Sequence, residues 1–406
     1  MSKVETVLKP TKIVIVTNIL SPYRKFFYDL LFKTMKEKGS QLTVLVMAKT
    51  EANRKWDYDD YSTEYTRLLE GKSLNLPGHI FFHFNKGIKA VLKELKPDIV
   101  VAAGGYTLPT IMRVVNLQRS LKYKMLFWSE SHLSSVKNHN GLTVFIRETI
   151  RKSFYKKFDA FWSPGKLADQ FIFKYSNPKA KTIFVPNLVD GALYFECSRR
   201  TIDEKKNIRE KYKIPEDRFV FFCPARLSAE KGLENFLKLF NKTQSIKKCT
   251  LIVAGDGEQK EMLLKLIASL GSNDIRLLGN KDSHEMLDLY AIADCFLMPS
   301  LSDANPLTCI EALWSGLPIL VSNHVGNYPE AVKVGENGYV FSYEEENEAI
   351  KLIDLVVNSN EKRRKSASTI SQTIAKELYS PAENVSRLID ETLKVFDVSN
   401  TKGSGS

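Results

Sequence analysis

A chain of 406 residues is long enough for roughly two or three domains, each with its own apolar core. Hydrophobic residues make up 43% and charged residues 26% of it, which excludes an intrinsically disordered or fibrous protein, and no run of about 18 apolar residues predicts a membrane span. The net charge is +12, and residues 1–200 hold 33 Lys and Arg against 17 Asp and Glu, so we expect this half to meet an anionic partner.

Short runs of β-branched and aromatic residues alternate with helix-length segments along the whole chain. In the first half we predict strands at 12–18, 42–48, 80–84, 97–103, 124–129, 159–162 and 182–186. In the second half we predict them at 219–224, 249–254, 274–278, 295–299, 318–322 and 338–341. Nearly continuous apolar strands between helices are typical of parallel sheets covered on both faces. The sequence therefore predicts two doubly wound α/β domains with a cleft between them.

A charged stretch at 197–218 separates the two sets of strands. We therefore expect a basic first domain over 1–200 and a second domain over 201–380. Apolar residues recur at helical spacing over 382–396, which predicts a helix over 381–397. The Gly- and Ser-rich composition of 398–406 is typical of a disordered tail.

The cysteines are few and widely spaced, so neither a zinc site nor a redox pair is predicted, and their odd number argues against a disulfide framework. They are Cys197, Cys223, Cys249, Cys295 and Cys309. The apolar stretch at 13–16 is too short for a signal peptide. We therefore expect a protein of the reducing cytoplasm.

The segment 300–318 (SLSDANPLTCIEALWSGLP) joins a predicted strand to a predicted helix. Asn305 is suited to cap that helix and Pro306 to occupy its first position, and a helix N-terminus favours a bound phosphate. Asp303 precedes the helix and Glu311 lies within it. Such a pair of acids can address the sugar and the ribose of one ligand. The alternative is a surface turn with a solvent-exposed Glu311.

A second candidate site directly follows the strand at 219–224. Arg226 lies at the carboxyl edge of that strand, where doubly wound sheets bind ligands. Lys231 and Gly232 open the next predicted helix. Two cations beside a helix N-terminus can neutralise a diphosphate, whereas the alternative is an exposed basic loop.

Six motifs in this order resemble the nucleotide-sugar-binding domain of glycosyltransferase family 4, whose members have the two-domain GT-B fold. They are ARLSAEKG at 225–232, VAGDGE at 253–258, IRLLGN at 275–280, LYAIADCFLMPS at 289–300, EALWSGLPILVS at 311–322 and GENGYVF at 335–341. In the first half, FVPNLVD at 184–190 resembles the signature at the end of the family's first domain. The resemblance is strong over 219–342 and weak before 140, and it implies that the helix at 381–397 returns to the first domain.

The resemblance implies a retaining transfer from a nucleotide diphosphate sugar without a metal or other cofactor. Arg226 and Lys231 would hold the diphosphate and stabilise the departing nucleotide. Glu311 would bind the ribose, and Asp303 the hexose. The other implied donor-binding residues are Asn305, Pro306, Leu307 and Thr308 at the helix start, Leu278 and Gly279 beside the base, and Asp256 and Gly257.

The chain departs from the family's pattern at three places. Asp303 stands where the family usually has Glu, and Asn305-Pro306 where it commonly has Phe-Gly. Because both changes lie beside the donor hexose, the identity of the sugar cannot be carried over. The family's frequent Gly-Gly after the first strand is replaced by LSPYR at 20–24, which leaves Tyr23 and Arg24 as polar groups on the acceptor side.

The acceptor half offers two further strand ends. Glu130 and His132 follow the strand at 124–129 and are candidates for orienting or deprotonating the acceptor hydroxyl, although a lone histidine after a strand is more often structural. Gly104 and Gly105 follow another strand and permit close approach of a substrate to the backbone.

Two basic amphipathic segments lie at 23–38 and 144–158. Either can bind an anionic membrane surface, or it can bury its apolar face on the sheet and leave its lysines in solvent. The first half carries a balance of +16, against −4 for the second half with 26 Lys and Arg and 30 Asp and Glu. This asymmetry favours a peripheral protein at the inner face of the cytoplasmic membrane, with a polyprenyl-diphosphate-linked glycan as acceptor in cell-surface polysaccharide synthesis.

Two other functions fit parts of the sequence. A non-hydrolysing nucleotide-sugar epimerase on the same fold would convert its donor without an acceptor. A nucleic-acid-binding protein would explain the charge but not the ordered motifs, so we expect no specific nucleic-acid partner.

Overall fold

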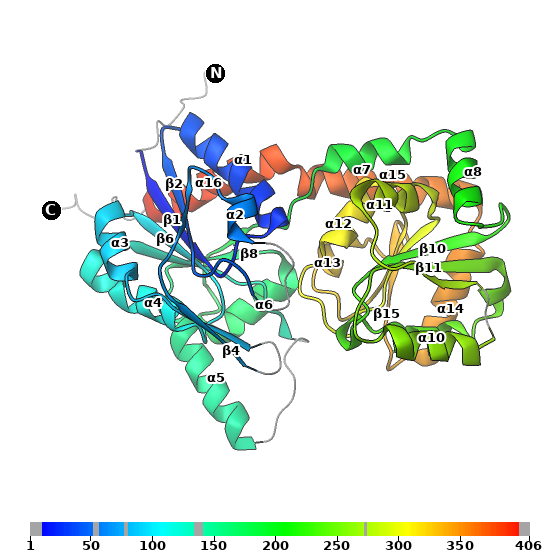
Figure 1. Ribbon diagram of the computed structural model, residues 1–406, viewed down its shortest axis with the longest axis horizontal. Coiled ribbons are helices and arrows are strands. Elements are labelled where there is room, and N and C mark those ends of the chain that lie inside the picture. Colours follow the sequence, from blue (N-terminus) through cyan, green and yellow to red (C-terminus); the bar gives the residue numbers. More distant parts are fainter. Residues whose placement is uncertain (1–9, 52–56, 77–79, 134–140, 272–273, 398–406) are drawn as a thin grey trace.

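The computed structural model describes residues 10–51, 57–76, 80–133, 141–271 and 274–397. It has two lobes, each built on one parallel sheet (Figure 1). Helices cover both faces of each sheet, and each lobe accordingly has two separate apolar clusters, one on each face of its sheet. The prediction of two doubly wound Rossmann-like domains in one α/β protein is confirmed.

The first lobe contains a seven-stranded sheet, a separate antiparallel strand pair and six of its own helices among the described residues. The strands of the sheet are β1 (Lys12–Thr17), β2 (Gln41–Val46), β3 (Thr66–Leu68), β6 (Ile99–Ala103), β7 (Lys124–Trp128), β8 (Ala160–Ser163) and β9 (Thr182–Phe184). The pair is β4 (Lys72–Leu76) and β5 (Ile80–Phe84). The helices are α1 (Pro22–Glu37), α2 (Tyr58–Tyr61), α3 (Ile88–Leu95), α4 (Pro109–Leu121), α5 (Gly141–Tyr155) and α6 (Lys166–Tyr175).

The sheet of the first lobe has the order β3-β2-β1-β6-β7-β8-β9, with every neighbouring pair parallel. Three strands differ from the prediction. The strand predicted at 80–84 forms β5, which pairs antiparallel with β4 outside the main sheet. The sequence did not predict β3 or β4, because β3 has only three residues and β4 (KSLNL) lacks a continuous apolar run.

The second lobe contains a six-stranded parallel sheet in the order β12-β11-β10-β13-β14-β15. Its strands are β10 (Phe219–Pro224), β11 (Cys249–Ala254), β12 (Ile275–Leu277), β13 (Cys295–Met298), β14 (Ile319–Ser322) and β15 (Gly338–Phe341), all near their predicted positions. Its helices are α7 (Gly191–Ser198), α8 (Ile202–Lys211), α9 (Leu233–Phe240), α10 (Lys260–Ser269), α11 (Ser283–Ile292), α12 (Leu307–Trp314), α13 (Tyr328–Ala331), α14 (Glu346–Val357) and α15 (Glu361–Tyr379). Two 3₁₀ turns, η2 (Ala229–Lys231) and η3 (Gln244–Lys248), complete it.

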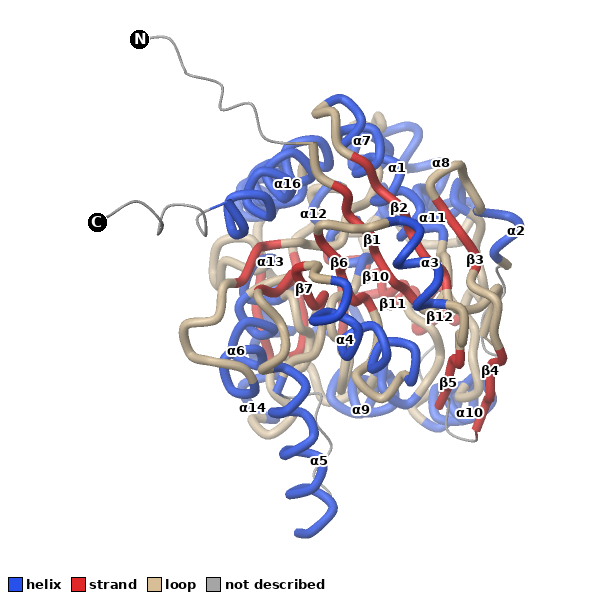
Figure 2. Tube along the Cα trace, turned by 90° about the vertical axis from the view of Figure 1, so that its left-hand side faces the viewer, coloured by secondary structure: helices blue, strands red, loops and turns tan. Residues whose placement is uncertain are grey.

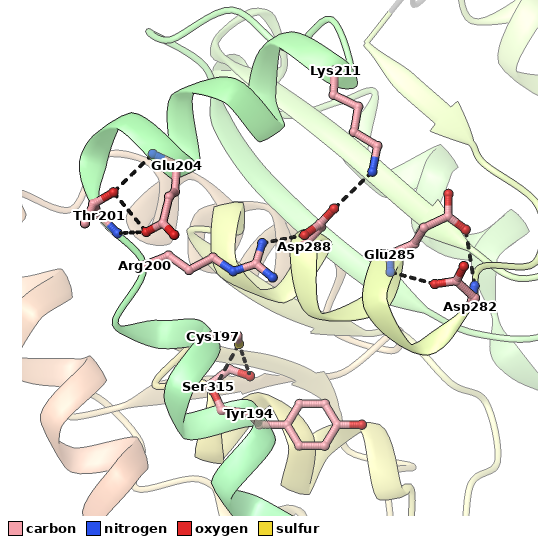
Figure 3. Close-up of polar contacts among 10 residues, drawn as sticks. All are labelled: Tyr194, Cys197, Arg200, Thr201, Glu204, Lys211, Asp282, Glu285, Asp288 and Ser315. Atoms are coloured by element: carbon pink, nitrogen blue, oxygen red, sulfur yellow. Dashed lines mark hydrogen bonds and ion pairs between the residues drawn. The ribbon is translucent and has the colours of Figure 1, made fainter.

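The chain enters the second lobe earlier than predicted. Helix α7 packs on α11 and α12, and a Cβ on Gly191 would lie 2.3 Å from the Trp314 ring. Arg200 and Lys211 then both form ion pairs with Asp288 of α11 (Figure 3). The crossing between the lobes therefore precedes Gly191, whereas the sequence places the boundary after residue 200.

The last helix, α16 (Pro381–Asp397), returns to the first lobe and lies beside α1 (Figure 1). Its apolar side chains Val385, Leu388 and Ile389 join the core beneath α1. The Trp162 Nε1–H donates a hydrogen bond to Thr392 Oγ1 at 3.1 Å. Ser380 thus marks the second crossing between the lobes, directly after α15. The predicted tail at 398–406 lies outside the described residues.

Helices α1 and α5, the two basic amphipathic segments, have different surroundings. In α1 the apolar residues Phe27, Leu31 and Met35 are buried in the core, so the alternative of packing on the sheet holds there. Helix α5 projects from the first lobe (Figure 2). It exposes the apolar side chains of Val144, Phe145, Ile146 and Ile150, whereas Phe154 and Tyr155 near its end are buried. Among the described residues, no helix has both the length and the apolar character that are needed to cross a bilayer.

Candidate functional site

The predicted donor residues gather at one edge of the second sheet. Arg226 follows β10, Asp256 and Gly257 follow β11, Leu278 and Gly279 follow β12, and Asp303 follows β13. These four strands are neighbours in the order β12-β11-β10-β13, and all are parallel. Since the carboxyl ends of parallel strands meet at one edge, the residues form one face toward the cleft, where α/β sheets bind ligands.

A cation and an acid form the centre of this face. Lys231 Nζ lies 2.5 Å from Asp303 Oδ2, and both side chains are largely buried. The position of Lys231 is fixed by Gly232, which has φ +66° and would bring a Cβ to 2.1 Å from the Pro299 carbonyl oxygen. Lys231 ends the 3₁₀ turn η2, so it precedes α9 and does not open it, contrary to the prediction.

Arg226 belongs to the same group. Its Nη2 lies 2.5 Å from Glu230 Oε1 on η2, and about half of its side chain is exposed. The Glu230 carbonyl accepts hydrogen bonds from the backbone amides of Leu301 and Ser302. Arg226 therefore stands beside the loop that carries Asp303, with a guanidinium that is accessible to an anion.

Glu311 is buried behind this face. It is 5% exposed, and the Tyr290 hydroxyl donates a hydrogen bond to its Oε2 at 2.7 Å. Burial raises the pKa of the Glu311 carboxyl, although hydrogen bonds from Tyr290 and Tyr194 act in the opposite direction. The pKa of Tyr23 in the first lobe is raised mainly by the burial of Tyr23 itself and further by the charge of Glu311. The carboxyl is thus held by two tyrosines and lies near a residue of the facing lobe.

The start of α12 differs by one residue from the prediction. The helix begins at Leu307 with Pro306 as its N-cap, so Asn305 does not cap it. Asn305 is 9% exposed, and its carboxamide has no hydrogen-bond partner among the described residues. The backbone is held instead: the Asn305 carbonyl accepts from Asn187 Nδ2 at 2.9 Å, and the Thr308 carbonyl from the Tyr290 hydroxyl at 3.3 Å.

The loops after β11 and β12 are tied to each other and to the loop after β10. Gly255 donates a backbone hydrogen bond to the Gly279 carbonyl at 2.8 Å, and Leu227 donates one to the Asp256 carbonyl at 3.0 Å. The Asp256 carboxylate pairs with Lys260 at 3.1 Å. A Cβ on Gly257 would lie 2.3 Å from the Leu227 carbonyl oxygen, so this backbone approach requires glycine.

His132 reaches the donor face from the opposite lobe. Its side chain is buried, and it forms a hydrogen bond with the backbone of Asp303. Burial lowers the pKa of the His132 imidazole, and the Asp303 charge opposes that shift. Two residues predicted from separate halves of the sequence are therefore in contact across the cleft.

A cavity of about 680 Å³ opens beside this contact. First-lobe residues form most of its wall, and Ala304 and Leu307 close it from the second lobe. The predicted acceptor-side residues Tyr23, Arg24, Gly104, Gly105 and Glu130 all line it.

Arg24 organises the polar wall of this cavity. Its Nη2 lies 2.9 Å from Glu130 Oε1, and its guanidinium lies over the Trp128 ring, 3.8 Å from the ring centroid. Gly104 is equally constrained, because a Cβ there would lie 2.6 Å from Asn18 Oδ1. The wall thus holds an acid that pairs with Arg24 and a glycine that Asn18 leaves no room to replace. The binding of an acceptor here stays a prediction.

Sequence reasoning missed Tyr194, Tyr290 and Glu51. The two tyrosines hold Glu311, and Glu51 lines the cavity. Tyr290 lies within one of the quoted motifs, and Glu51 follows the strand at 42–48, so the strand-end argument that selected Glu130 applies to it as well. Nothing in the local sequence marks Tyr194.

The described residues around this site include neither a cluster of metal ligands nor an exposed thiol. Among the described residues, no group of three or more His, Cys, Asp or Glu side chains is placed to hold a metal ion. Metal independence itself stays a prediction. All five cysteines are buried and free, and burial raises the pKa of the Cys223 thiol, close to the donor face, to about 12.

Comparisons with known proteins identify the family. The sequence model of glycosyl transferases group 1 matches residues 204–372. An uncharacterized glycosyltransferase of Methanocaldococcus jannaschii, MJ1059, is 30% identical over 70% of this chain and 75% of its own length. The lipopolysaccharide 1,2-N-acetylglucosaminetransferase of Salmonella typhimurium is 26% identical over 53% of this chain and 57% of its own length.

Solved structures share the fold over nearly the whole chain. Anabaena HepE in complex with UDP and glucose has a TM-score of 0.69 at 16% identity, covering 95% of this chain and 99% of HepE. WaaG, a glycosyltransferase involved in lipopolysaccharide biosynthesis, has a TM-score of 0.65 at 15% identity, covering 93% and 99%. The chain has the GT-B fold and belongs to the group 1 glycosyltransferases.

Proposed function

We propose that this glycosyltransferase is a retaining, metal-independent enzyme of family 4 that transfers a sugar from a nucleotide diphosphate donor to a lipid-linked glycan. The observation that carries the proposal is the meeting of Lys231, Asp303 and His132. A cation and an acid of the second lobe lie together at the strand edge, and the His132 side chain of the first lobe forms a hydrogen bond with the backbone of that acid. Donor chemistry and acceptor chemistry thus share one point.

In this proposal the donor diphosphate replaces carboxylates as the partner of two cations. Lys231 exchanges Asp303 for a phosphate oxygen, and Arg226 exchanges Glu230. As the bond from the sugar to the diphosphate breaks, negative charge grows on the leaving oxygen. A fixed ammonium and guanidinium stabilise that charge, and such preorganised groups contribute most in the transition state.

Asp303, released from Lys231, accepts hydrogen bonds from the donor hexose, and Glu311 accepts them from the ribose. The backbone amides at the start of α12 add dipoles that favour the diphosphate. For the donor we propose a UDP-hexose or UDP-N-acetylhexosamine. HepE was solved with UDP and glucose, and the Salmonella relative is an N-acetylglucosaminetransferase.

The acceptor occupies the 680 Å³ cavity in this proposal. Glu130 orients an acceptor hydroxyl, and Arg24 keeps that carboxylate in place at 2.9 Å. A cavity of this size is unnecessary for an epimerase, which acts on its donor alone. Relatives of lipopolysaccharide and O-antigen synthesis support a growing cell-surface polysaccharide, linked to a polyprenyl diphosphate, as the acceptor.

The exposed residues of α5 support binding to an anionic lipid surface, and we place this binding at the inner side of the cytoplasmic membrane. Phe145, Ile146 and Ile150 are 68%, 50% and 51% exposed. Arg147 and Lys152 on the same helix are also exposed. Exposed apolar side chains among cations are the composition of a helix that lies in a lipid interface.

The test supplies purified protein with UDP-glucose, UDP-galactose, UDP-N-acetylglucosamine or GDP-mannose, with and without an octyl glycoside acceptor. The proposal predicts release of nucleoside diphosphate that depends on the acceptor, without added metal and in the presence of a chelator. NMR of the product should show the anomeric configuration of the donor. Conversion of a donor to its epimer without acceptor, or an inverted product, would contradict it.

A further inference from the structure

A second acid lines the cavity besides Glu130. Glu51 lies in the loop after β2, at the carboxyl edge of the first sheet, and it forms part of the cavity wall. The charge of Glu130 is balanced by Arg24 at 2.9 Å. Glu51 is 9% exposed, and its partner is a histidine. The two acids of this wall are therefore held in different ways.

The histidine is His83 on β5, which is fully buried. Its Nε2 lies 3.3 Å from Glu51 Oε1, and its Nδ1 lies 2.8 Å from the hydroxyl of Ser73 on β4. A carboxylate only accepts hydrogen bonds, so the Nε2–H donates to Glu51 and, in the neutral ring, Nδ1 accepts from Ser73. This chain of bonds fixes both the ring and the carboxylate.

The backbone around His83 is fixed as well. Thr110 on α4 donates a hydrogen bond to the His83 carbonyl at 2.8 Å. Asn85, two residues further on, donates from Nδ2 to the Met47 carbonyl at 3.0 Å, which anchors it to the segment that leads to Glu51. The β4–β5 pair, α4 and the loop after β2 thus form one support for the Glu51 carboxylate.

Such a support has a physical cost. A carboxylate that is nine-tenths buried loses most of its hydration, and one hydrogen bond from an imidazole compensates only part of that loss. A carboxylate offers about four lone-pair positions, of which His83 occupies one. Within the described part of the chain His83 is the only side chain seen to bond this carboxylate, which lies on the wall of a cavity that a hydroxylated ligand can enter.

We propose that Glu51 is an acceptor-binding residue, positioned by His83 and Ser73, which accepts a hydrogen bond from a sugar hydroxyl of the acceptor glycan. This inference rests on the proposed function, since it places the acceptor in the cavity. Glu51 and Glu130 then bind separate hydroxyls of one sugar, and together they select the hydroxyl that faces the donor.

The experiment compares Glu51→Gln with Glu64→Gln, an exposed glutamate of the same lobe, in steady-state transfer from the best UDP-sugar to the best octyl glycoside. Because a hydrogen bond to a charged group is lost, Glu51→Gln should raise the acceptor KM roughly tenfold. The donor KM should stay within about twofold. Glu64→Gln should change neither constant.

Two changes at His83 test the positioning role. His83→Gln keeps an N–H donor near the position of Nε2 and should retain most of the acceptor affinity. His83→Ala removes that donor and should raise the acceptor KM as Glu51→Gln does. Melting curves of both variants establish that each is folded, and His83→Gln carries the test if the alanine variant is not.

The outcomes separate this inference from the proposed function. If the wild type transfers sugar and Glu51→Gln keeps the acceptor KM of Glu64→Gln, the role of Glu51 is refuted and the proposed function stands. Equal increases in donor and acceptor KM also refute it, because they indicate a general disturbance. If the wild type transfers to no glycoside, the proposed function fails and the inference fails with it.

Discussion

Lys231 Nζ lies 2.5 Å from Asp303 Oδ2, although Lys231 follows β10, Asp303 follows β13, and 72 positions in the sequence separate them. Each largely buried charge neutralises the other. A donor diphosphate must therefore compete with Asp303 for Lys231. It follows that the two residues should influence donor binding in opposite directions, which two substitutions can test.

Lys231→Ala should lower kcat/KM for the donor by about 10²–10³-fold, because the charge on the departing diphosphate loses a preorganised cation. Nucleotide release in the acceptor-dependent assay measures this. Lys238→Ala is the matched control, since Lys238 also pairs with an acid, Glu234, but on the exposed face of α9. Equal kcat/KM for the two variants would exclude Lys231 from the donor site.

Asp303→Asn should separate binding from catalysis. The substitution frees Lys231 from its intramolecular partner, so the dissociation constant for UDP should fall, by a fewfold to roughly tenfold. Transfer should nevertheless slow, because the carboxylate that addresses the hexose is lost. Calorimetric titration with UDP and the transfer rate give the two readings. Weaker UDP binding would show that Asp303 does not compete with the diphosphate.

The stability of the protein should depend on pH through Glu311. Its carboxyl has a raised pKa in the folded state because of burial, so the folded protein holds this proton more tightly than the unfolded chain. The contribution of Glu311 to the free energy of unfolding therefore falls as pH rises from the ordinary pKa of about 4.5 through the raised value.

Glu311→Gln removes this titration and keeps an oxygen for the Tyr290 hydroxyl. Urea-unfolding midpoints of wild type and variant are measured at intervals of about one pH unit between roughly pH 4.5 and 8. The midpoint of the variant should become increasingly higher than that of the wild type as pH rises. Glu336→Gln, at an exposed position, should run parallel to the wild type. A constant difference between wild type and Glu311→Gln across that range would contradict the expectation.

Gly232→Ala tests the close approach that positions Lys231. The residue has φ +66°, and a Cβ would lie 2.1 Å from the Pro299 carbonyl oxygen. Gly39 has nearly the same φ, +69°, with nothing within 4 Å. Gly39→Ala should cost about 1–2 kcal/mol from the backbone alone. Gly232→Ala should cost roughly a further 1–3 kcal/mol from the clash. Equal losses of stability in denaturant unfolding would refute the clash.

The exposed face of α5 predicts membrane binding. The triple variant Phe145→Ser, Ile146→Ser, Ile150→Ser should bind phosphatidylglycerol-containing vesicles at least roughly tenfold more weakly than the wild type in a sedimentation assay. The reason is that the variant loses the apolar area that the wild type buries in the bilayer. Ile202→Ser, at an exposed apolar residue of the second lobe, is the control. Vesicle binding that survives the triple substitution would assign it to another surface.

The sequence predicted the parallel strands well because their apolar runs are continuous, as in β10 (FVFFCP) and β11 (CTLIVA). Motif order also located Lys231 and Asp303, since both follow such strands. It could not predict that α7 joins the second lobe. That placement depends on the contact between Gly191 and Trp314, two residues far apart in sequence. The bonds that hold Glu51 also join residues far apart in sequence. They come from His83 and Ser73 on β5 and β4, which pair outside the main sheet.

The return of α16 to the first lobe determines the order in which the two lobes can complete their cores during synthesis on the ribosome. Val385, Leu388 and Ile389 fill a core whose other members include residues of β1, α1 and β8. Strands made before the second lobe therefore wait for residues made after it before their apolar face is covered. The second lobe, complete at Tyr379, becomes a finished domain first. The nascent first lobe keeps part of its apolar face uncovered until α16 is made, so it depends on protection from aggregation during that interval.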